Sequence, residues 1–258
     1  MKQPILNRAG KRICVVVEET SKPEGLAFVM HGLGGYKDQA HIQTIAQAFL
    51  KAGYTVVTFD TTNTFGESDG NYEDATVTNY YTDLEDVIAW AHGQPWFMKP
   101  FVLCGHSLGG ICTALYAERH PEQVKALAPI ATVVSGALSL ETYKMFNQQK
   151  ELAKWKKKGI QVTKSFDAKR VKRLKWTHME DRLQYDLLPD VAKLSMPVLL
   201  IVGEQDDSTP PVHQKILFDL LPGKKELHVI EAAPHTFYEP RELAELNQLV
   251  TAWIDTLE

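Results

Sequence analysis

Hydrophobic residues recur along most of the chain in short runs, which polar, glycine and proline residues separate. Apolar and β-branched runs predict a hairpin at residues 4–19 and strands at 26–30, 54–59, 101–104, 124–130, 197–202 and 226–230. Between them, apolar residues spaced by three or four positions predict helices at 43–52, 79–92, 108–120, 212–221 and 243–254. Strands that alternate with helices predict the α/β class, with a mostly parallel central sheet covered by helices on both faces.

The alternation is interrupted between residues 135 and 190, where aromatic residues and many charges follow no β-α repeat. We interpret segment 135–190 as a cap inserted over the carboxyl ends of the strands, between two core segments at 1–134 and 191–258. Its aromatic and methionine side chains are expected to form mostly a small core of the cap itself. The alternative is that they line an acyl or aryl pocket.

Residues 150–175 of the cap are strongly basic. They hold 11 Lys or Arg and 2 Asp or Glu, a net charge of +9, which leaves −13 for the rest of the chain. We interpret this stretch as a solvated face. The alternative is a surface that attracts anionic substrates or a lipid surface, and salt-sensitive turnover would distinguish the two.

Composition narrows the class of protein. The chain has 258 residues, of which 44% are hydrophobic, enough for one large core. Its net charge of −4 gives no reason to expect a nucleic-acid partner. The 3 cysteines show no C-x-x-C spacing, so we expect reduced, buried thiols and a cytoplasmic location. Neither a signal peptide nor a membrane span is indicated, so no stable membrane insertion is expected. The oligomeric state is not predicted.

The stretch around residue 107 combines a strand-like run, a serine between glycines and the start of a helix. It reads Gly105-His106-Ser107-Leu108-Gly109-Gly110, so G-x-S-x-G spans the turn. A serine at such a turn adopts a strained backbone conformation and projects its hydroxyl above the sheet edge. The helix that starts at Leu108 directs free N–H groups towards it. We therefore predict that Ser107 is a nucleophile, rather than part of an ordinary glycine-serine turn.

Two residues that could activate this serine follow later predicted strands. His235 follows the last strand, and an imidazole can take up and return a proton near neutral pH. Asp206 follows the strand at 197–202 and is predicted to accept the other imidazole N–H. Asp207 and Glu204 are the alternatives for this acid. The order Ser, Asp, His along the chain is that of α/β-hydrolases.

Backbone N–H groups are expected to form an oxyanion hole. Leu108, directly after the nucleophile, is one predicted donor, and Leu33, in the glycine-rich turn after the strand at 26–30, is the other. A phosphate-binding loop is the alternative for this turn, but no G-K-[ST] or G-x-G-x-x-G spacing is present. His31 and His106 are expected to have structural roles.

Together these motifs resemble the α/β-hydrolase superfamily, in its carboxylesterase and monoacylglycerol-lipase-like branch, which includes bacterial cinnamoyl (feruloyl) esterases. The matching pieces are His31-Gly32-Leu33-Gly34-Gly35, Gly66-Glu67-Ser68-Asp69-Gly70, Gly105-His106-Ser107-Leu108-Gly109-Gly110, Gly203-Glu204-Gln205-Asp206 and Pro234-His235-Thr236-Phe237. The resemblance implies a triad of Ser107, Asp206 and His235, with oxyanion donors at Leu33 and Leu108. One departure is the loop after Asp60, which lacks the arginine of the family pattern D-x-R-G-x-G-x-S and is one residue longer. The shape of the pocket at that loop therefore cannot be transferred.

The function expected from the sequence is a serine hydrolase that cleaves carboxylic esters of small molecules through an acyl-enzyme. Neither a cofactor nor a metal is expected to be needed. Thioesters, acyl peptides and other aminopeptidase substrates, and lactones are alternative substrates for the same residues. A binding protein that retained the fold without activity is a remote alternative, because such proteins usually lose a member of the triad.

Overall fold

A computed structural model describes residues 1–164 and 171–257. Its main sheet has eight strands in the order β1-β2-β4-β3-β5-β6-β9-β10. β1 and β2 pair antiparallel with each other and β2 with β4, whereas the remaining neighbours are parallel. The strands are β1 Lys2–Leu6, β2 Arg12–Glu18, β3 Gly25–Met30, β4 Tyr54–Asp60, β5 Phe101–His106, β6 Val124–Ile130, β9 Val198–Gly203 and β10 Lys225–Ile230. The predicted class, a mostly parallel sheet with helices, is confirmed.

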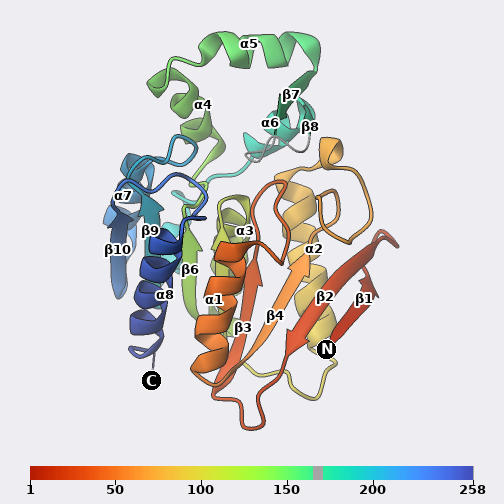
Figure 1. The fold of residues 1–258 in the computed structure, drawn as a ribbon, viewed down its shortest axis with the longest axis vertical. Helices are drawn as coiled ribbons and strands as arrows, with labels where there is room; N and C mark the ends of the chain where they lie inside the picture. The colour runs from red at the N-terminus through yellow and green to blue at the C-terminus, as the bar shows by residue number, and fades with distance from the viewer. Residues whose placement is uncertain (165–170, 258) are drawn as a thin grey trace.

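Helices cover both faces of this sheet (Figure 1). Their apolar faces, together with strands β3, β4 and β5 that are buried along their whole length, form two layers of core. α1 and α8 pack on one face, and α2, α3 and α7 on the other. The bounds of these helices are α1 Ala40–Lys51, α2 Val77–Ala91, α3 Leu108–Arg119, α7 Pro211–Leu220 and α8 Pro240–Ile254, with short 3-10 turns η1 Tyr72–Asp74, η2 Pro121–Gln123 and η3 Val191–Lys193.

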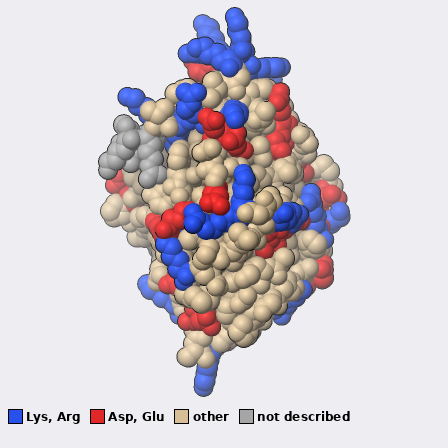
Figure 2. All heavy atoms as spheres, turned by 90° about the vertical axis from the view of Figure 1, so that its right-hand side faces the viewer, with Lys and Arg blue, Asp and Glu red and all other residues tan. Residues whose placement is uncertain are grey.

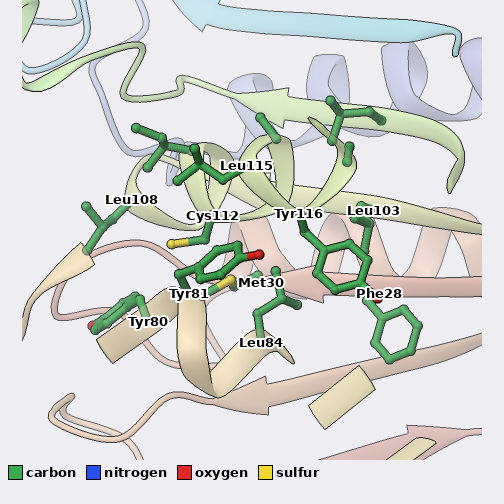
Figure 3. Packing of buried hydrophobic residues seen from close by; sticks show 14 of the residues in the cluster. Phe28, Met30, Tyr80, Tyr81, Leu84, Leu103, Leu108, Cys112, Leu115 and Tyr116 are labelled. Atoms are coloured by element: carbon green, nitrogen blue, oxygen red, sulfur yellow. The ribbon is translucent and has the colours of Figure 1, made fainter. Parts of the chain in front are cut away.

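The packing of α2 against α3 fixes the helix that begins at Leu108. Figure 3 shows Tyr80 and Leu84 of α2 beside Cys112 of α3, with Met30 of β3 between the helices and the sheet. All of these side chains are buried. Removing them from water stabilises the contact in proportion to the apolar area that is covered. The start of α3 is therefore held against rigid neighbours.

The segment between β6 and β9 lies beyond the carboxyl ends of the strands, at the top of Figure 1. It contains α4 Gly136–Met145, α5 Gln149–Lys158, the antiparallel pair β7 Ile160–Lys164 and β8 Val171–Lys175, and α6 Thr177–Arg182. The sequence did not predict the β7–β8 hairpin, because its strands are mostly exposed and basic, so hydrophobic alternation is weak there. The exact division into core and cap at residues 135 and 190 stays a prediction.

The basic side chains of this segment gather on one end of the molecule. The lysines of α5 are exposed, and Figure 2 shows Lys and Arg clustered at that end. On its other side α5 buries Trp155, whose ring packs edge-on against Trp176 at 5.2 Å between centroids. Lys169 and Arg170 of the predicted basic stretch lie outside the described residues. The exposed lysines of α5 agree with the interpretation of this stretch as a solvated face.

Among the described residues, no helix combines the length and the apolar character needed to cross a bilayer.

Candidate active site

Ser107 lies at the turn between β5 and α3 in a backbone conformation that few residues other than glycine adopt. Its φ is 55° and its ψ is −114°. Its N–H donates to the carbonyl of Ile130 at 2.9 Å, and its own carbonyl accepts from the N–H of Gly110 at 3.0 Å. A Cβ on Gly105 would lie 2.3 Å from the carbonyl oxygen of Gly109. Glycine at position 105 is therefore required for strand and helix to approach this closely.

The three residues predicted as a triad lie in one continuous chain of hydrogen bonds. Ser107 Oγ is 2.8 Å from His235 Nε2, and His235 Nδ1 is 2.8 Å from Asp206 Oδ2. A carboxylate only accepts, so Nδ1 carries the imidazole proton and Nε2 is left to accept from the serine hydroxyl. Asp207 is exposed, and its carboxylate accepts from the hydroxyl of Ser208 instead. Of these two aspartates, Asp206 is therefore the one placed to orient the imidazole.

The acid and the imidazole meet because the loops after β9 and β10 are bonded to each other. The N–H of Gln205 donates to the carbonyl of Ala233 at 2.9 Å, and the N–H of Ala232 donates to the carboxylate of Glu204 at 2.9 Å. Glu204 therefore ties the two loops together, and its carboxylate is not hydrogen-bonded to the imidazole.

The carboxylate of Asp206 is surrounded by donors. It accepts the N–H of Ser208 at 2.8 Å, the N–H of Thr209 at 2.7 Å and the hydroxyl of Thr209 at 2.8 Å. Burial alone would raise the pKa of Asp206, but the charge and hydrogen bond of His235 and these N–H groups outweigh it, so the pKa lies below its usual value. Asp206 thus stays ionised at neutral pH. The sequence reasoning missed Thr209, although an Asp in a loop signals an Asx-turn, in which its carboxylate accepts the N–H two residues on, here that of Ser208.

The two predicted oxyanion donors flank the serine. Leu108 is the first residue of α3, and Leu33 lines the same cavity as Ser107. Within the part of the chain that the structure describes, neither backbone N–H donates to a protein acceptor. A Cβ on Gly32 would lie 2.9 Å from Ser107 Cβ, so the loop that carries Leu33 packs directly against the serine. Two free N–H groups beside a hydroxyl can receive a developing oxyanion.

Two further histidines surround the serine and remain neutral. His31 Nδ1–H donates to the carbonyl of Gly32 at 2.8 Å, and its Nε2 accepts the N–H of Thr61 at 3.0 Å. His106 Nε2–H donates to the carbonyl of His235 at 2.9 Å. Burial lowers the pKa of His31, and burial with the nearby His235 lowers the pKa of His106 to about 3. Both imidazoles hold loops in place, as expected from the sequence.

Comparison with known protein families agrees with this fold. Residues 21–241 match the family model Hydrolase_4, described as serine aminopeptidase, S33. The chain belongs to this family of α/β-hydrolases.

Similar proteins include both uncharacterised and named hydrolases. An uncharacterized 31.7 kDa protein in the traX-finO intergenic region of Escherichia coli is 28% identical over 266 residues, covering 90% of this hydrolase and 92% of that protein. The mitochondrial palmitoyl-protein thioesterase ABHD10 of Bos taurus is 29% identical over 197 residues, covering 73% of this hydrolase and 59% of that protein. The structure of Est1E from Butyrivibrio proteoclasticus with ferulic acid bound has a TM-score of 0.79 at 18% identity, covering 100% of this hydrolase and 98% of that chain. At 18% identity, the likeness to Est1E shows a shared fold and nothing more.

This hydrolase departs from the family pattern in the loop after β4, and a buried lysine holds that loop. Lys37 Nζ lies 3.1 Å from Asp60 Oδ2 and 2.6 Å from Glu67 Oε2, and the Lys37 N–H donates to Asp60 Oδ1 at 2.7 Å. Hydrogen bonds from Lys2 and Lys37 lower the pKa of Glu67 to about 2. The lysine thus joins the loops after β3 and β4 through its contacts with both carboxylates.

Beside Lys37, three atoms that could bind a metal ion lie within 4.8 Å of one another. They belong to the side chains of Cys14, Asp60 and Glu67. The ammonium of Lys37 already contacts both carboxylates and supplies the positive charge that they require. We therefore assign no metal to this cluster.

The serine opens into a cavity of about 310 Å³ between the sheet ends and the segment above them. From that segment the lining includes Tyr143, Trp155 and Met179, so some of its aromatic and methionine side chains face the cavity. Arg182 and His178 of α6 also line it, and the sequence reasoning did not single them out. No signal distinguishes them in the sequence, because they stand among many other charged residues.

Proposed function

We propose that this hydrolase cleaves carboxylic esters of small molecules through an acyl-enzyme formed on Ser107. The observation that carries the proposal is the hydrogen-bonded chain from Ser107 Oγ through His235 to Asp206, with 2.8 Å at each contact. A serine hydroxyl is a weak nucleophile unless a base within hydrogen-bond reach removes its proton. The strained turn, the two free N–H groups and the cavity in front of the hydroxyl support the same proposal.

In the first half of the proposed reaction, Ser107 Oγ attacks the ester carbonyl while its proton passes to His235 Nε2. The N–H groups of Leu33 and Leu108 stabilise the oxyanion that forms, and Asp206 stabilises the imidazolium. The bond between the carbonyl carbon and the alcohol oxygen then breaks. His235 returns the proton to the leaving alcohol, and the acyl group stays on Ser107.

In the second half, a water molecule takes the place of the alcohol. His235 removes one of its protons as the water oxygen bonds to the acyl carbon, and the same N–H groups stabilise the second oxyanion. The bond to Ser107 Oγ breaks, the proton returns to the serine, and the carboxylic acid leaves. Every proton in this cycle is carried by a residue of the chain or by water, so the proposed steps call for neither a metal nor a cofactor.

Thioesters are the second candidate substrates. The bovine relative at 29% identity is named as a palmitoyl-protein thioesterase, and thioester hydrolysis uses the same nucleophile, base and oxyanion donors. The cavity of about 310 Å³ favours a short or medium acyl group over a long chain that lies wholly inside it. Hydrolysis of matched oxygen and sulfur esters of one acyl group separates the two candidates.

The proposal is tested with a fluorophosphonate probe and a panel of nitrophenyl esters from acetyl to long acyl, including an aryl-acyl member. The probe should label Ser107. Ser107→Ala should lower kcat/KM by roughly 10⁴-fold or more, and Asp206→Asn by about 10⁴-fold. The matched control is Asp207→Asn, which removes the neighbouring, exposed carboxylate and should change turnover little. A well-folded protein that neither reacts with the probe nor turns over any ester or thioester would refute the proposal.

We also propose that the protein works in the cytoplasm. Cys14, Cys104 and Cys112 are free and buried, and burial raises the pKa of each thiol. Such thiols are typical of a reducing compartment. Fractionation of cells that express the chain tests this location.

A further inference from the structure

One wall of the cavity that contains Ser107 carries polar groups that the ester mechanism leaves unused. This wall is formed by α6, and two of its side chains, His178 and Arg182, line the cavity that also contains the hydroxyl of Ser107. A buried polar group without a partner is costly, so proteins usually satisfy such groups with protein atoms, water or ligand. Each of these two side chains has a buried atom for which the structure shows no protein partner.

Arg182 is the first of them. Its Nε is shut off from solvent and donates to no acceptor, and among the described residues no carboxylate lies within ion-pair distance of its guanidinium. The adjacent carboxylate of Asp181 is engaged elsewhere, because one of its oxygens accepts the N–H of Thr78 at 3.0 Å. Burial lowers the pKa of Arg182, although an arginine side chain stays charged in proteins. The cavity wall therefore carries a positive charge that no described carboxylate pairs with, although Asp207, Lys164 and Lys172 line the same cavity.

His178 is the second. It is 1% exposed, and its Nδ1–H donates to the carbonyl of Ala75 at 2.8 Å. That contact fixes the tautomer, so the buried Nε2 carries a lone pair, and this lone pair has no partner. Burial, and next the charge of Arg182, lowers the pKa of His178 to about 3, which keeps the ring neutral. The ring adds a hydrogen-bond acceptor to the wall and no second charge.

Both side chains belong to a helix that is fixed to the core. Asp181 binds the hydroxyl as well as the N–H of Thr78 at the start of α2, and His178 binds Ala75 just before it. A carboxylate at a helix N-terminus is favoured by the helix dipole and by the free N–H groups there. The helix that carries the guanidinium is therefore held in place before any ligand arrives, which lowers the entropy cost of binding one.

We propose that Arg182 binds a carboxylate of the substrate, so that the esters preferred by this hydrolase carry a free acid group away from the scissile carbonyl. This inference rests on the proposed ester hydrolysis and narrows its substrate class. A guanidinium presents parallel N–H donors that match the two oxygens of a carboxylate. Nε2 of His178 accepts a hydroxyl or N–H that the same substrate carries. The binding group is distinct from the exposed lysines of α5, which lie at the outer end of the molecule.

The test uses pairs of nitrophenyl esters that differ in one charge. Each pair consists of a nitrophenyl hemi-ester of succinic, glutaric or adipic acid and the same compound with its free acid group methylated. The wild type should favour the anionic member of at least one pair by roughly 10- to 100-fold in kcat/KM, as expected for charge-assisted hydrogen bonds. Arg182→Gln should abolish most of this preference through KM, and Arg182→Lys should restore part of it.

The matched control is Lys157→Gln, which removes one exposed positive charge of α5 from a residue that does not line the cavity. It should leave the preference intact. Equal turnover of both members of every pair by the wild type would overturn the proposal. So would a preference that Lys157→Gln and Arg182→Gln reduce alike, because that result indicates a general field and no specific contact.

A binding measurement separates this proposal from the proposed catalysis. Ser107→Ala cannot form the acyl-enzyme, but it should bind glutarate or adipate in calorimetry, and Arg182→Gln in the same background should weaken binding roughly 10-fold or more. Binding of a dicarboxylate without any ester turnover by the wild type would support the site and refute the ester mechanism. Labelling of Ser107 and turnover of neutral esters, with no dicarboxylate bound, would refute the site alone.

Discussion

Glu118 provides a quantitative test of the packing behind the candidate nucleophile. It lies in α3, is 5% exposed, and its Oε1 has no hydrogen-bond partner among the described residues. Burial, and next the charge of Asp190, raises the pKa of Glu118 to about 8, although Lys193 and Arg119 partly offset this. The folded protein therefore holds this carboxyl protonated at neutral pH.

The sign and size of the effect follow from proton linkage. A glutamate of an unfolded chain titrates near pH 4.3, so between about pH 4.3 and 8 the folded state binds more protons than the unfolded state. Stability then falls as the pH rises through this window and is constant above it. One pKa unit corresponds to about 1.4 kcal/mol, so the whole loss is at most about 5 kcal/mol.

Glu118→Gln removes this titration while keeping the size of the side chain. We expect the variant and the wild type to have similar unfolding free energies at pH 5, and the variant to be more stable by a few kcal/mol at pH 9. Urea denaturation at pH 5, 7 and 9 measures both. The control is Glu122→Gln, an exposed neighbour in η2. A difference between Glu118→Gln and the wild type that does not change with pH would refute the reasoning.

Two further substitutions test the loops around the serine. Gly32→Ala places a Cβ 2.9 Å from Ser107 Cβ, so it should lower kcat/KM at least about tenfold and cost about 1–3 kcal/mol of stability. The control is Gly93→Ala, whose Cβ meets nothing closer than 3.6 Å. Equal activity of the two variants would contradict the argument. Lys37→Met leaves the buried carboxylate of Asp60 without its cation and should cost about 3–5 kcal/mol in chemical denaturation. Adding Asp60→Asn should recover part of that loss, and a single variant as stable as the wild type would show that the network is not stabilising.

Much of the fold follows from the sequence because its central strands β3, β4, β5 and β9 are buried along their whole length. β3, β4 and β5 are mostly apolar or β-branched runs that end at glycine or polar residues, which is the pattern of a central parallel strand. α1 starts three residues before the position that the sequence pattern predicts, because the buried His41 belongs to the helix although its side chain is polar. Local pattern cannot show that a polar side chain will face the core.

The candidate site likewise has residues that the sequence predicts and residues that only the structure reveals. The serine, histidine and aspartate stand in motifs whose order along the chain implies a common edge of the sheet, and the structure brings the three side chains into contact. Their catalytic roles stay predictions. Arg182 and Lys37 could not be found from the sequence, because a cation in a charged stretch becomes notable only through its surroundings. Arg182 has a buried Nε without a partner, whereas the ammonium of Lys37 is enclosed by carboxylates.

The path of the chain through the sheet also bears on synthesis. Ser107 follows β5, whereas the imidazole that would activate it follows β10, and the two halves of the sheet join where β6 pairs with β9 at Leu127 and Val198. During translation the serine emerges from the ribosome well over one hundred residues before His235 (roughly ten seconds at bacterial rates of 5–20 residues per second). Under the proposed mechanism, the hydroxyl of a nascent chain is inert and becomes reactive only when the last strand docks. The same mechanism implies that acyl metabolites of the surrounding cell meet no activated serine until folding is complete.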